Sequence, residues 1–205
     1  MNTASCLILA SQSPRRAQLL TEAGFAFEQR SPPFADPDQP PGHLGRDEAE
    51  GYAVALAEMK ALSLDEAVIP SLVLAADTIC VDAAGQLVGK PRDRAHAAEM
   101  IRAFSGSEHR VITGVALLRV GVDQSILDLE ADTAVVRFRT ITAEQIDDYL
   151  ATEDWRGKAG GYNLFDRQAA GWPIEVEGDP TTVVGLPMKR LVPMLNTLLD
   201  GDALS

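Results

Sequence analysis

Residues 6–20 read CLILASQSPRRAQLL and contain the junction of strand and helix on which the fold depends. The apolar run at 6–10 has the length and composition of a buried β-strand. Ser13 is a preferred N-cap residue, and Pro14 falls at the first helical position, where its missing N–H group costs nothing. The residues that follow regain helical periodicity. The stretch therefore predicts a strand that leads directly into a helix.

Two arginines, Arg15 and Arg16, stand in the first turn of this helix. The N-terminus of a helix carries unpaired backbone N–H groups and the positive end of the helix dipole. Guanidinium groups add forked donors that suit phosphate oxygens. The pattern indicates an anion site, and polyphosphate is the anion that this donor set fits. The alternative is a strand–helix corner whose two arginines are simply solvated.

Composition indicates a soluble globular chain. Its 205 residues are 46% hydrophobic, enough for a substantial core in one large domain or two small lobes. No apolar run approaches the roughly 20 residues of a membrane span, and no basic segment precedes a cleavable apolar one. The two cysteines, Cys6 and Cys80, lie in strand-like runs, which favours core positions in a reducing compartment. We therefore expect a cytoplasmic protein.

The net charge narrows the choice of partner. With 30 acidic and 18 basic residues, the formal net charge is −12. A surface this negative repels DNA, RNA and anionic membranes, which bind to basic faces. A small anion can still bind where the few cations converge.

Strand-like and helical runs alternate along the chain, which predicts an α/β fold with a mixed sheet. A polar turn at 121–124 joins two long runs and indicates an antiparallel hairpin. The segment 31–46 holds five prolines, and we interpret this long irregular stretch as a candidate lid. The expected strands are 6–10, 25–29, 71–76, 79–82, 108–119, 126–139 and 172–177. The expected helices are 14–23, 47–63, 93–104, 142–150 and one from about 187.

Asp77 follows the apolar run 72–76, so it is expected at the end of a buried strand. In open α/β sheets, ligands collect at that edge. A carboxylate there is able to hold a metal, act as a general base, or do both; the alternative is an Asp that caps the next turn. Lys90 stands between a glycine and a proline and is expected near this edge, unless it is an ordinary surface lysine.

Glycines surround Lys158 in the segment 157–163. They allow the backbone to approach a ligand closely, and the lysine supplies a point charge for phosphate. The segment does not match a Walker A loop, and no Gly-x-Gly-x-x-Gly motif is present. The three histidines lack metal-ligand spacing, and no Gly-x-Ser-x-Gly elbow indicates a serine hydrolase.

Taken together, these segments resemble the Maf family of nucleoside triphosphate pyrophosphatases. Six blocks match in the family's order and spacing across nearly the whole chain, and together they are specific although none would be alone. The matching blocks are Leu9-Ala10-Ser11-Gln12-Ser13-Pro14-Arg15-Arg16, Ala75-Ala76-Asp77-Thr78, Gly89-Lys90-Pro91, Ser105-Gly106 with His109 and Thr113-Gly114-Val115, Lys158-Ala159-Gly160-Gly161-Tyr162, and Val184-Gly185-Leu186-Pro187.

The resemblance implies hydrolysis between the α and β phosphates of a nucleotide with Mg²⁺ or Mn²⁺, in a cytoplasmic homodimer. It also implies one domain over residues 1–205 with a central cleft, in an elongated two-lobed α/β fold similar to the inosine triphosphatase group. By motif match, Asp77 is the catalytic base, and Asp77 and Asp36 are the metal ligands. The match at Asp36 is the weaker of these, because its loop is atypical. The residues assigned to substrate binding are Ser11, Ser13, Arg15, Arg16, Lys60, Thr78, Lys90, Lys158 and Phe165.

Base choice depends in the family on three positions. Arg15 is shared by both specificity types of the family. Asp77-Thr78 is similar to the type that acts on dTTP and UTP. The type that acts on 7-methyl-GTP and related nucleotides has Asp-Gln at these two positions. The third position is normally Gln or Glu, but here Phe165 or Asp166 falls there. An aromatic ring at Phe165 would stack on a base, and Asn163 or Gln168 would offer an amide to its edge. The sequence favours dTTP and UTP, with other or modified nucleotides as the alternative.

Two other functions compete with this interpretation. A phosphomonoesterase of the haloacid dehalogenase type would use Asp77 as a covalent nucleophile, but it needs a second Asp where this chain has Ile79. A nucleotide-binding regulator of cell division would need no catalysis, yet the chain retains Asp77, Lys60 and Lys90. Release of pyrophosphate, orthophosphate or neither separates the three.

Overall fold

The structure is a computed structural model that describes residues 6–37, 40–64, 71–120 and 125–202. Its strands are β1 (Cys6–Ala10), β2 (Glu28–Arg30), β3 (Ser71–Asp82), β4 (Leu87–Val88), β5 (Glu108–Val120), β6 (Ser125–Phe138) and β7 (Ile174–Glu177). Its helices are α1 (Pro14–Glu22), α2 (Arg46–Leu62), α3 (Arg94–Phe104), α4 (Ala143–Thr152), the 3₁₀ turn η1 (Ala159–Gly161), α5 (Leu164–Ala169), α6 (Pro180–Val184) and α7 (Met188–Asp202).

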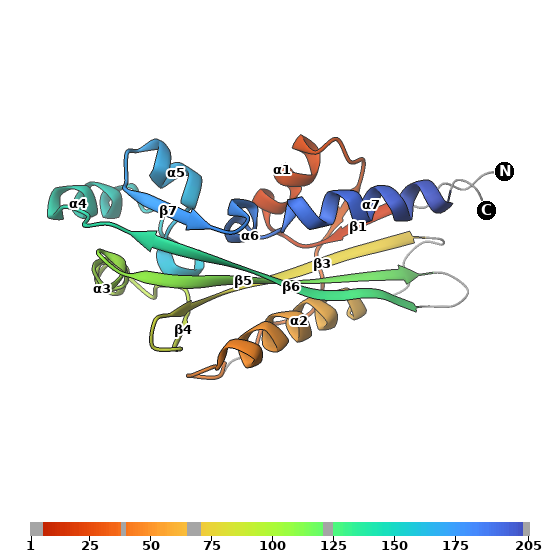
Figure 1. Cartoon of the computed structure of the whole chain (residues 1–205), viewed down its shortest axis with the longest axis horizontal. Coiled ribbons are helices and arrows are strands. Elements are labelled where there is room, and N and C mark those ends of the chain that lie inside the picture. The colour runs from red at the N-terminus through yellow and green to blue at the C-terminus, as the bar shows by residue number, and fades with distance from the viewer. Residues whose placement is uncertain (1–5, 38–39, 65–70, 121–124, 203–205) are drawn as a thin grey trace.

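The strands form one mixed sheet, which confirms the predicted α/β class. Their order is β2-β1-β3-β5-β6-β7, and β4 pairs with β3 outside this path. β1 is parallel to β2 and β3, whereas the β3–β5, β5–β6 and β6–β7 pairs are antiparallel. The long strands β3, β5 and β6 run along the elongated molecule, with α1 and α7 on one face and α2 on the other (Figure 1).

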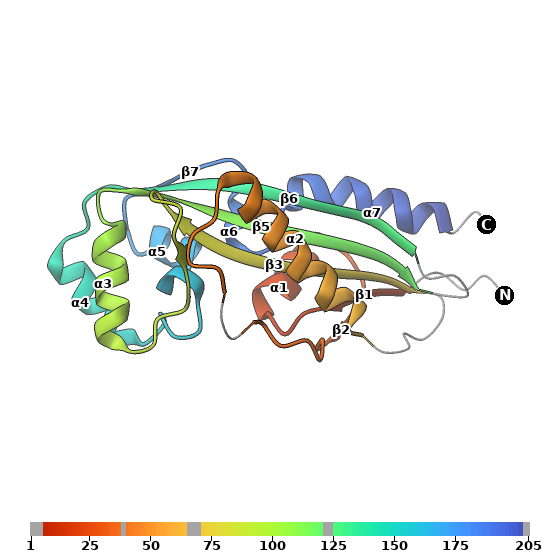
Figure 2. The ribbon, with the colours of Figure 1, turned by 90° about the horizontal axis from the view of Figure 1, so that it is seen from below.

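The hydrophobic core is divided between two ends of this sheet, as the expected two-lobed shape requires. In one lobe, α1 and α7 pack on β1, β3 and β5, and α2 covers the opposite face. In the other lobe, α3, α4 and α5 gather around the far ends of the long strands (Figure 2). This second core is rich in rings: Phe104, Phe138, Tyr149, Trp155, Tyr162 and Trp172.

β1 shows why the N-terminal stretch determines the fold. Leu7 and Leu9 pack toward α1 and α7, while Ile8 and Ala10 pack toward α2. A strand covered on both faces needs a continuous apolar run rather than an alternating one. At the helix start, the Ser13 side chain accepts a hydrogen bond from the Arg16 backbone N–H, as a cap does. The predicted strand–helix junction is therefore confirmed.

Gly114 of β5 lies directly beneath α2. A Cβ atom built there would be 2.3 Å from the Ala53 carbonyl atoms and 2.4 Å from the Val54 nitrogen. We expect Gly114→Ala to lower the free energy of unfolding by about 3 kcal/mol, because backbone cannot yield as a flexible side chain does. Urea denaturation measures this. The exposed helical Gly51 meets nothing within 4 Å, so Gly51→Ala is the matched control and should stabilise by about 0.5–1 kcal/mol.

Three expectations from the sequence were wrong in detail. β3 is one strand over Ser71–Asp82 rather than two pieces, because β5 pairs with it along its whole length. The short helices α5 and α6 had no prediction, and β2 begins later than expected. The predicted turn at 121–124 lies outside the described residues. None of the helices in the described part of the chain combines the length and apolar composition needed to cross a bilayer.

The proline-rich loop is pinned where it approaches α2. Leu44 N–H donates to the Gly85 carbonyl at 2.9 Å, and Leu87 N–H donates to the Gly42 carbonyl at 3.0 Å. The loop is therefore tied to the turn between β3 and β4 just before α2 begins. Its role as a lid stays a prediction.

Candidate active site

A cavity of about 430 Å³ lies where the two lobes meet along β3. Segments from the α1 N-terminus, the proline-rich loop, α2, β3, the β4–α3 connection and the glycine-rich segment 157–163 line it. The predicted site residues at this cavity are Ser13, Arg15, Arg16, Asp36, Lys60, Asp77, Thr78, Lys90 and Lys158. One hollow thus brings together five cations and two carboxylates from positions far apart in the chain.

Two predicted residues lie elsewhere. Ser11 lines a smaller adjoining cavity of about 240 Å³, which shares Ser13, Arg16, Asp36 and Lys60 with the larger one. Phe165 is 44% exposed in the first turn of α5 and does not line either cavity; its neighbour Leu164 lines the larger one. The helix α5, which the sequence did not predict, turns Phe165 away.

Asp77 owes its place to the end of β1 rather than to the end of its own strand. The parallel pairing stops at Ala10 opposite Ala75, and β3 continues beyond it. The β1 side of β3 is therefore open at Asp77, while Gly114 of β5 pairs on its other side. Asp77 is only 8% exposed. The expectation that this carboxylate ends a strand was wrong, although it does stand at the end of the neighbouring strand.

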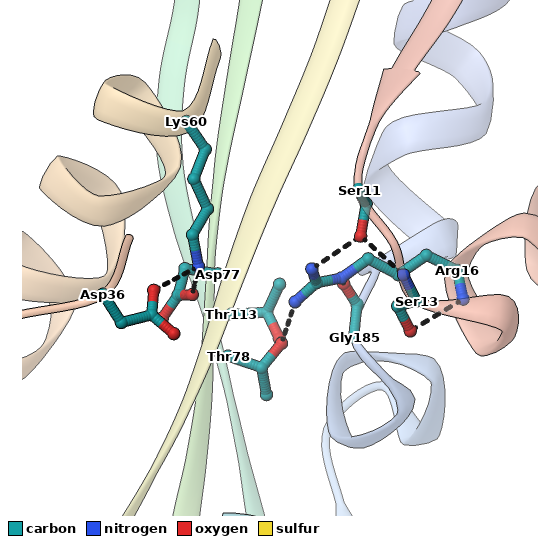
Figure 3. A network of polar contacts seen from close by, with 9 residues as sticks. All are labelled: Ser11, Ser13, Arg16, Asp36, Lys60, Asp77, Thr78, Thr113 and Gly185. Atoms are coloured by element: carbon teal, nitrogen blue, oxygen red, sulfur yellow. Dashed lines mark hydrogen bonds and ion pairs between the residues drawn. The ribbon is translucent and has the colours of Figure 1, made fainter. Parts of the chain in front are cut away.

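Asp77 and Thr78 face opposite sides of the sheet, because successive side chains alternate along a strand. Asp77 meets Lys60 from the last turn of α2 (Figure 3). The Lys60 ammonium donates a short hydrogen bond to Asp77 Oδ1 and lies 2.7 Å from Asp36 Oδ1. The lysine thus forms the centre of a carboxylate–ammonium–carboxylate group that joins α2, β3 and the proline-rich loop.

Arg16 meets Thr78 on the other side (Figure 3). Its Nη2 donates to Thr78 Oγ1 at 3.0 Å, its Nη1 to Ser11 Oγ at 3.1 Å, and its Nε to the Gly185 carbonyl at 2.9 Å. All three acceptors are neutral, and no carboxylate of the described residues forms an ion pair with this guanidinium. Burial lowers the pKa of Arg16, and the nearby Asp77 charge opposes that shift.

Hydrogen bonds continue from Arg16 through the sheet. The Thr113 hydroxyl donates to the Thr182 carbonyl at 2.7 Å, so its oxygen is free to accept from Thr78, 2.9 Å away. Thr78 in turn accepts from Arg16. Each hydroxyl can give only one proton, so the chain runs in one direction, from Arg16 to Thr182. It locks the guanidinium to β3, β5 and α6 at once.

The remaining lysines lie on the wall formed by the β4–α3 connection and the segment 157–163. Lys158 donates a short hydrogen bond to the Asp154 carbonyl, and burial lowers its pKa. Gly160 N–H donates to the Gly89 carbonyl at 3.0 Å, which links the segment of Lys158 to the loop of Lys90. Glycines with positive φ at 157, 160 and 161 give this segment its turns.

His109 lies behind this wall and is 1% exposed. Its Nε2 is 2.7 Å from the Tyr162 hydroxyl, and its ring stacks on Phe104 with centroids 4.0 Å apart. Burial lowers the pKa of His109 to about 3, because no charged group of the described residues compensates for the lost water. The imidazole is therefore neutral at physiological pH.

This buried histidine predicts a pH-dependent stability. The unfolded histidine has a pKa near 6.5, so the unfolded chain binds the extra proton first as the pH falls from about 6.5 toward 3. Above about pH 6.5 this difference in pKa does not lower stability. At pH 5, protonation of the unfolded histidine lowers the free energy of unfolding by about 2 kcal/mol. Urea denaturation of wild type and His109→Gln at pH 7 and pH 5 measures the difference. Equal losses in both proteins would show that the native state does not lower the pKa of His109.

Comparison with known proteins gives the site its context. A family model described as Maf-like protein matches residues 6–198. The chain belongs to the Maf family. This Maf protein is 40% identical over 192 residues to the dTTP/UTP pyrophosphatase of Salmonella typhimurium strain LT2, which covers 93% of this chain and 91% of the relative.

Other relatives of this Maf protein carry the same name. The dTTP/UTP pyrophosphatase of Symbiobacterium thermophilum is 40% identical over 189 residues, covering 92% of each chain. That of Ruegeria sp. strain TM1040 is 39% identical over 193 residues, covering 93% of each. The predicted resemblance to the Maf family, closer to the dTTP/UTP type, is confirmed.

Sequence reasoning left two residues of this Maf site without a role. Thr113 receives the hydrogen bond from Thr78, and the Gly185 carbonyl receives one from Arg16. Both belong to motif blocks that matched the family, and that was the only signal they gave. Their contribution is to hold other residues, which neither residue type nor spacing reveals.

Proposed function

We propose that this Maf protein hydrolyses the bond between the α and β phosphates of dTTP and UTP, producing the nucleoside monophosphate and pyrophosphate. The relatives that share about 40% of its sequence are named for this activity. The observation that carries the proposal is the cavity in which a carboxylate, Asp77, stands among five cations. A triphosphate with about four negative charges needs that neutralisation before water can attack phosphorus.

The cavity has a charged end and an apolar wall, which orients a nucleotide. Lys60 contacts Asp77, and Arg16 contacts the adjacent Thr78; together with Arg15, which lines the same cavity, they suit the phosphates. The apolar wall suits the base and consists of Ile79, Val88, Val111, Leu164 and Val183. In this orientation the α phosphate lies next to Asp77, and Lys90 and Lys158 are available to the departing pyrophosphate.

The reaction then needs one water in line with the leaving group. The water oxygen forms a bond to the α phosphorus, the bond from phosphorus to the bridging oxygen breaks, and pyrophosphate leaves with the electron pair. The Asp77 carboxylate takes the proton of the attacking water as general base. Lys60 orients this carboxylate through its hydrogen bond to Oδ1, which leaves Oδ2 to accept the proton.

The residues present fit a divalent cation. Oxygens of Asp36 and Asp77 already converge on a positive charge, the Lys60 ammonium. The described residues contain no group of three or more His, Cys, Asp or Glu that would hold a metal ion, so phosphate oxygens would complete the ligand set, as is usual for Mg²⁺. A Mg²⁺ or Mn²⁺ ion held by the two carboxylates would neutralise phosphate charge and polarise the phosphoryl oxygens.

We propose that base selection rests on Asn163, one of the amides that the sequence suggested, rather than on Phe165. Phe165 is turned to solvent, so the proposed stacking partner is missing from the cavity. Asn163 lines the cavity, and its amide is suited to hydrogen-bond the edge of a pyrimidine. Apolar side chains nearby would accept the 5-methyl group of thymine.

A panel of dTTP, UTP, dCTP, GTP and 7-methyl-GTP with Mg²⁺ or Mn²⁺ tests the proposal. We expect pyrophosphate from dTTP and UTP at rates well above those for the purine nucleotides. Orthophosphate would indicate a phosphomonoesterase instead. Binding without any release would indicate a nucleotide-binding regulator. Pyrophosphate from the other nucleotides only would keep the chemistry and overturn the base assignment.

The remaining features of the proposal concern the whole molecule. We propose a single domain over residues 1–205 that assembles as a homodimer in the cytoplasm. Light scattering on the purified protein measures the mass in solution. A mass of one chain at micromolar concentration would contradict the dimer.

A further inference from the structure

The segment 157–163 forms a wall of the cavity but has almost no regular structure of its own. Within the described residues, Lys158 Nζ donates to the nearby Asp154 carbonyl, and three further hydrogen bonds tie the segment to more distant parts of the chain. Gly160 N–H donates to the Gly89 carbonyl at 3.0 Å, Tyr149 Oη donates to the Gly161 carbonyl at 2.8 Å, and Tyr162 Oη lies 2.7 Å from His109 Nε2. The position of Lys158 therefore depends on contacts outside the segment.

Of these anchors, His109 is the one that belongs to the central sheet. It lies in β5, paired with Asp82 of β3 on one side and with Val136 of β6 on the other. Its ring stacks on Phe104 and lies 5.6 Å from the Phe138 ring, centroid to centroid. A side chain held by two strands and two rings gives Tyr162 a fixed point, whereas α4, which carries Tyr149, lies outside the sheet.

Tyr162 transmits this position to the cavity. Its ring lines the cavity while its hydroxyl points into the core toward His109. The edge of the ring meets Phe138 at 5.1 Å and Phe104 at 6.0 Å. Because Gly160 is bonded to Gly89, a shift of Tyr162 would also move the loop that carries Lys90.

We propose that His109 is a positioning residue of the nucleotide site: by holding Tyr162, it fixes the spacing of Lys158 and Lys90 for the β and γ phosphates. The inference rests on the proposed function, because it assumes that a triphosphate occupies the cavity. His109 itself does not line the cavity and touches no substrate. Its lack of any partner at Nδ1 among the described residues is consistent with a side chain retained for the single bond at Nε2.

The test compares two ligands that differ in the phosphates concerned. Calorimetry measures the dissociation constants of UMP and of UTP with a methylene group between its α and β phosphates, which resists hydrolysis. We expect His109→Leu to weaken the triphosphate analogue about tenfold and to leave UMP unchanged. His109→Gln retains a polar nitrogen near the position of Nε2, so it should restore most of the loss.

A second variant keeps the inference testable if His109→Leu does not fold. Tyr162→Phe removes only the hydroxyl, and it should produce the same selective loss. The double variant should be no worse than either single one, because both break one interaction. Leu195→Ala in α7, buried in the other lobe, is the control for lowered stability alone and should leave both dissociation constants unchanged.

Two results would overturn the inference. One is a His109→Leu protein that melts earlier but binds the triphosphate analogue as wild type does, which is the behaviour of an ordinary core histidine. The other is an equal loss for UMP and the triphosphate analogue. If the wild type binds both ligands yet releases no pyrophosphate, the proposed function fails while the selective loss in the variants still supports this role of His109.

Discussion

Asp77→Asn is expected to reduce pyrophosphate release from UTP by about 10³-fold or more while the chain stays folded. The amide has the shape of the carboxylate and can still accept the Lys60 hydrogen bond through its oxygen, so the local structure should persist. It cannot take a proton from water, and removing a general base costs about 10²–10⁴ in rate. It is also a much weaker ligand for a divalent cation. Rates under saturating UTP, with circular dichroism to verify folding, measure the effect.

Comparison of Asp36→Asn with Asp77→Asn separates the two roles proposed for Asp77, general base and metal ligand. The Asp36 side chain is 54% exposed and shares Lys60 with Asp77, so its loss should weaken Mn²⁺ binding but reduce the rate far less. Mn²⁺ titration by electron paramagnetic resonance in the presence of UMP follows the metal directly. If Asp77→Asn binds Mn²⁺ as wild type does but is inactive, Asp77 acts as the base. Full turnover in Asp77→Asn would end the proposed mechanism.

The parts of the fold set by local chemistry were predictable from the sequence. The apolar run of β1, the Ser13 cap and the following proline determine a strand and a helix start within a few residues, and both were confirmed. The capping box at Thr142 likewise placed the start of α4. Such signals need no knowledge of the rest of the chain.

The position of Asp77 was not predictable in this way. Polar residues at 77 and 78 interrupt an apolar run, which reads locally as the end of a strand. In the structure β5 continues its ladder past them, and β1, the neighbour on the other side, is the strand that stops. Where a neighbouring strand ends depends on the assembled sheet, so the sequence indicated the right carboxylate for a partly wrong reason.

Contacts that hold the site were also hidden in the sequence. Arg16 was predicted as a phosphate ligand, but its ties to Ser11, Thr78 and Gly185 join positions up to 169 residues apart. Phe165 was predicted to stack on the nucleobase because of its position in the motif. The sequence had not predicted the helix α5, which turns this side chain away from the cavity. Motif position identifies which residues are near a ligand only when the local backbone matches as well.

Arg16→Met tests the charge of this cavity most directly, and we expect the ratio kcat/KM for UTP to fall by about 10²–10³. The guanidinium is bound by three neutral acceptors, so its positive charge is left for a ligand rather than cancelled by an ion pair. Wild-type Arg16 would donate hydrogen bonds to the substrate and to the transition state, and the variant lacks them. Each such bond from a charged donor is worth about 1.5–3 kcal/mol, which sets this range. Arg16→Lys should be intermediate, because it keeps the charge and loses the three-way attachment.

Thermal unfolding with pyrophosphate distinguishes a phosphate ligand from a structural brace. A ligand that binds only the native state raises the unfolding temperature, so wild type should be stabilised by added pyrophosphate. Arg16→Met should lose most of this increase. Its own unfolding temperature should fall by only a few degrees, because the loss of the hydrogen bonds to Ser11, Thr78 and Gly185 is partly offset by removing a charge that forms no ion pair within the described residues. Arg139→Met, at a residue whose side chain is 72% exposed on the surface, is the matched control and should retain the full response. A variant that melts much earlier yet keeps the pyrophosphate response and the activity would assign Arg16 to the framework, and the phosphate contacts would then fall to Arg15, Lys90 and Lys158.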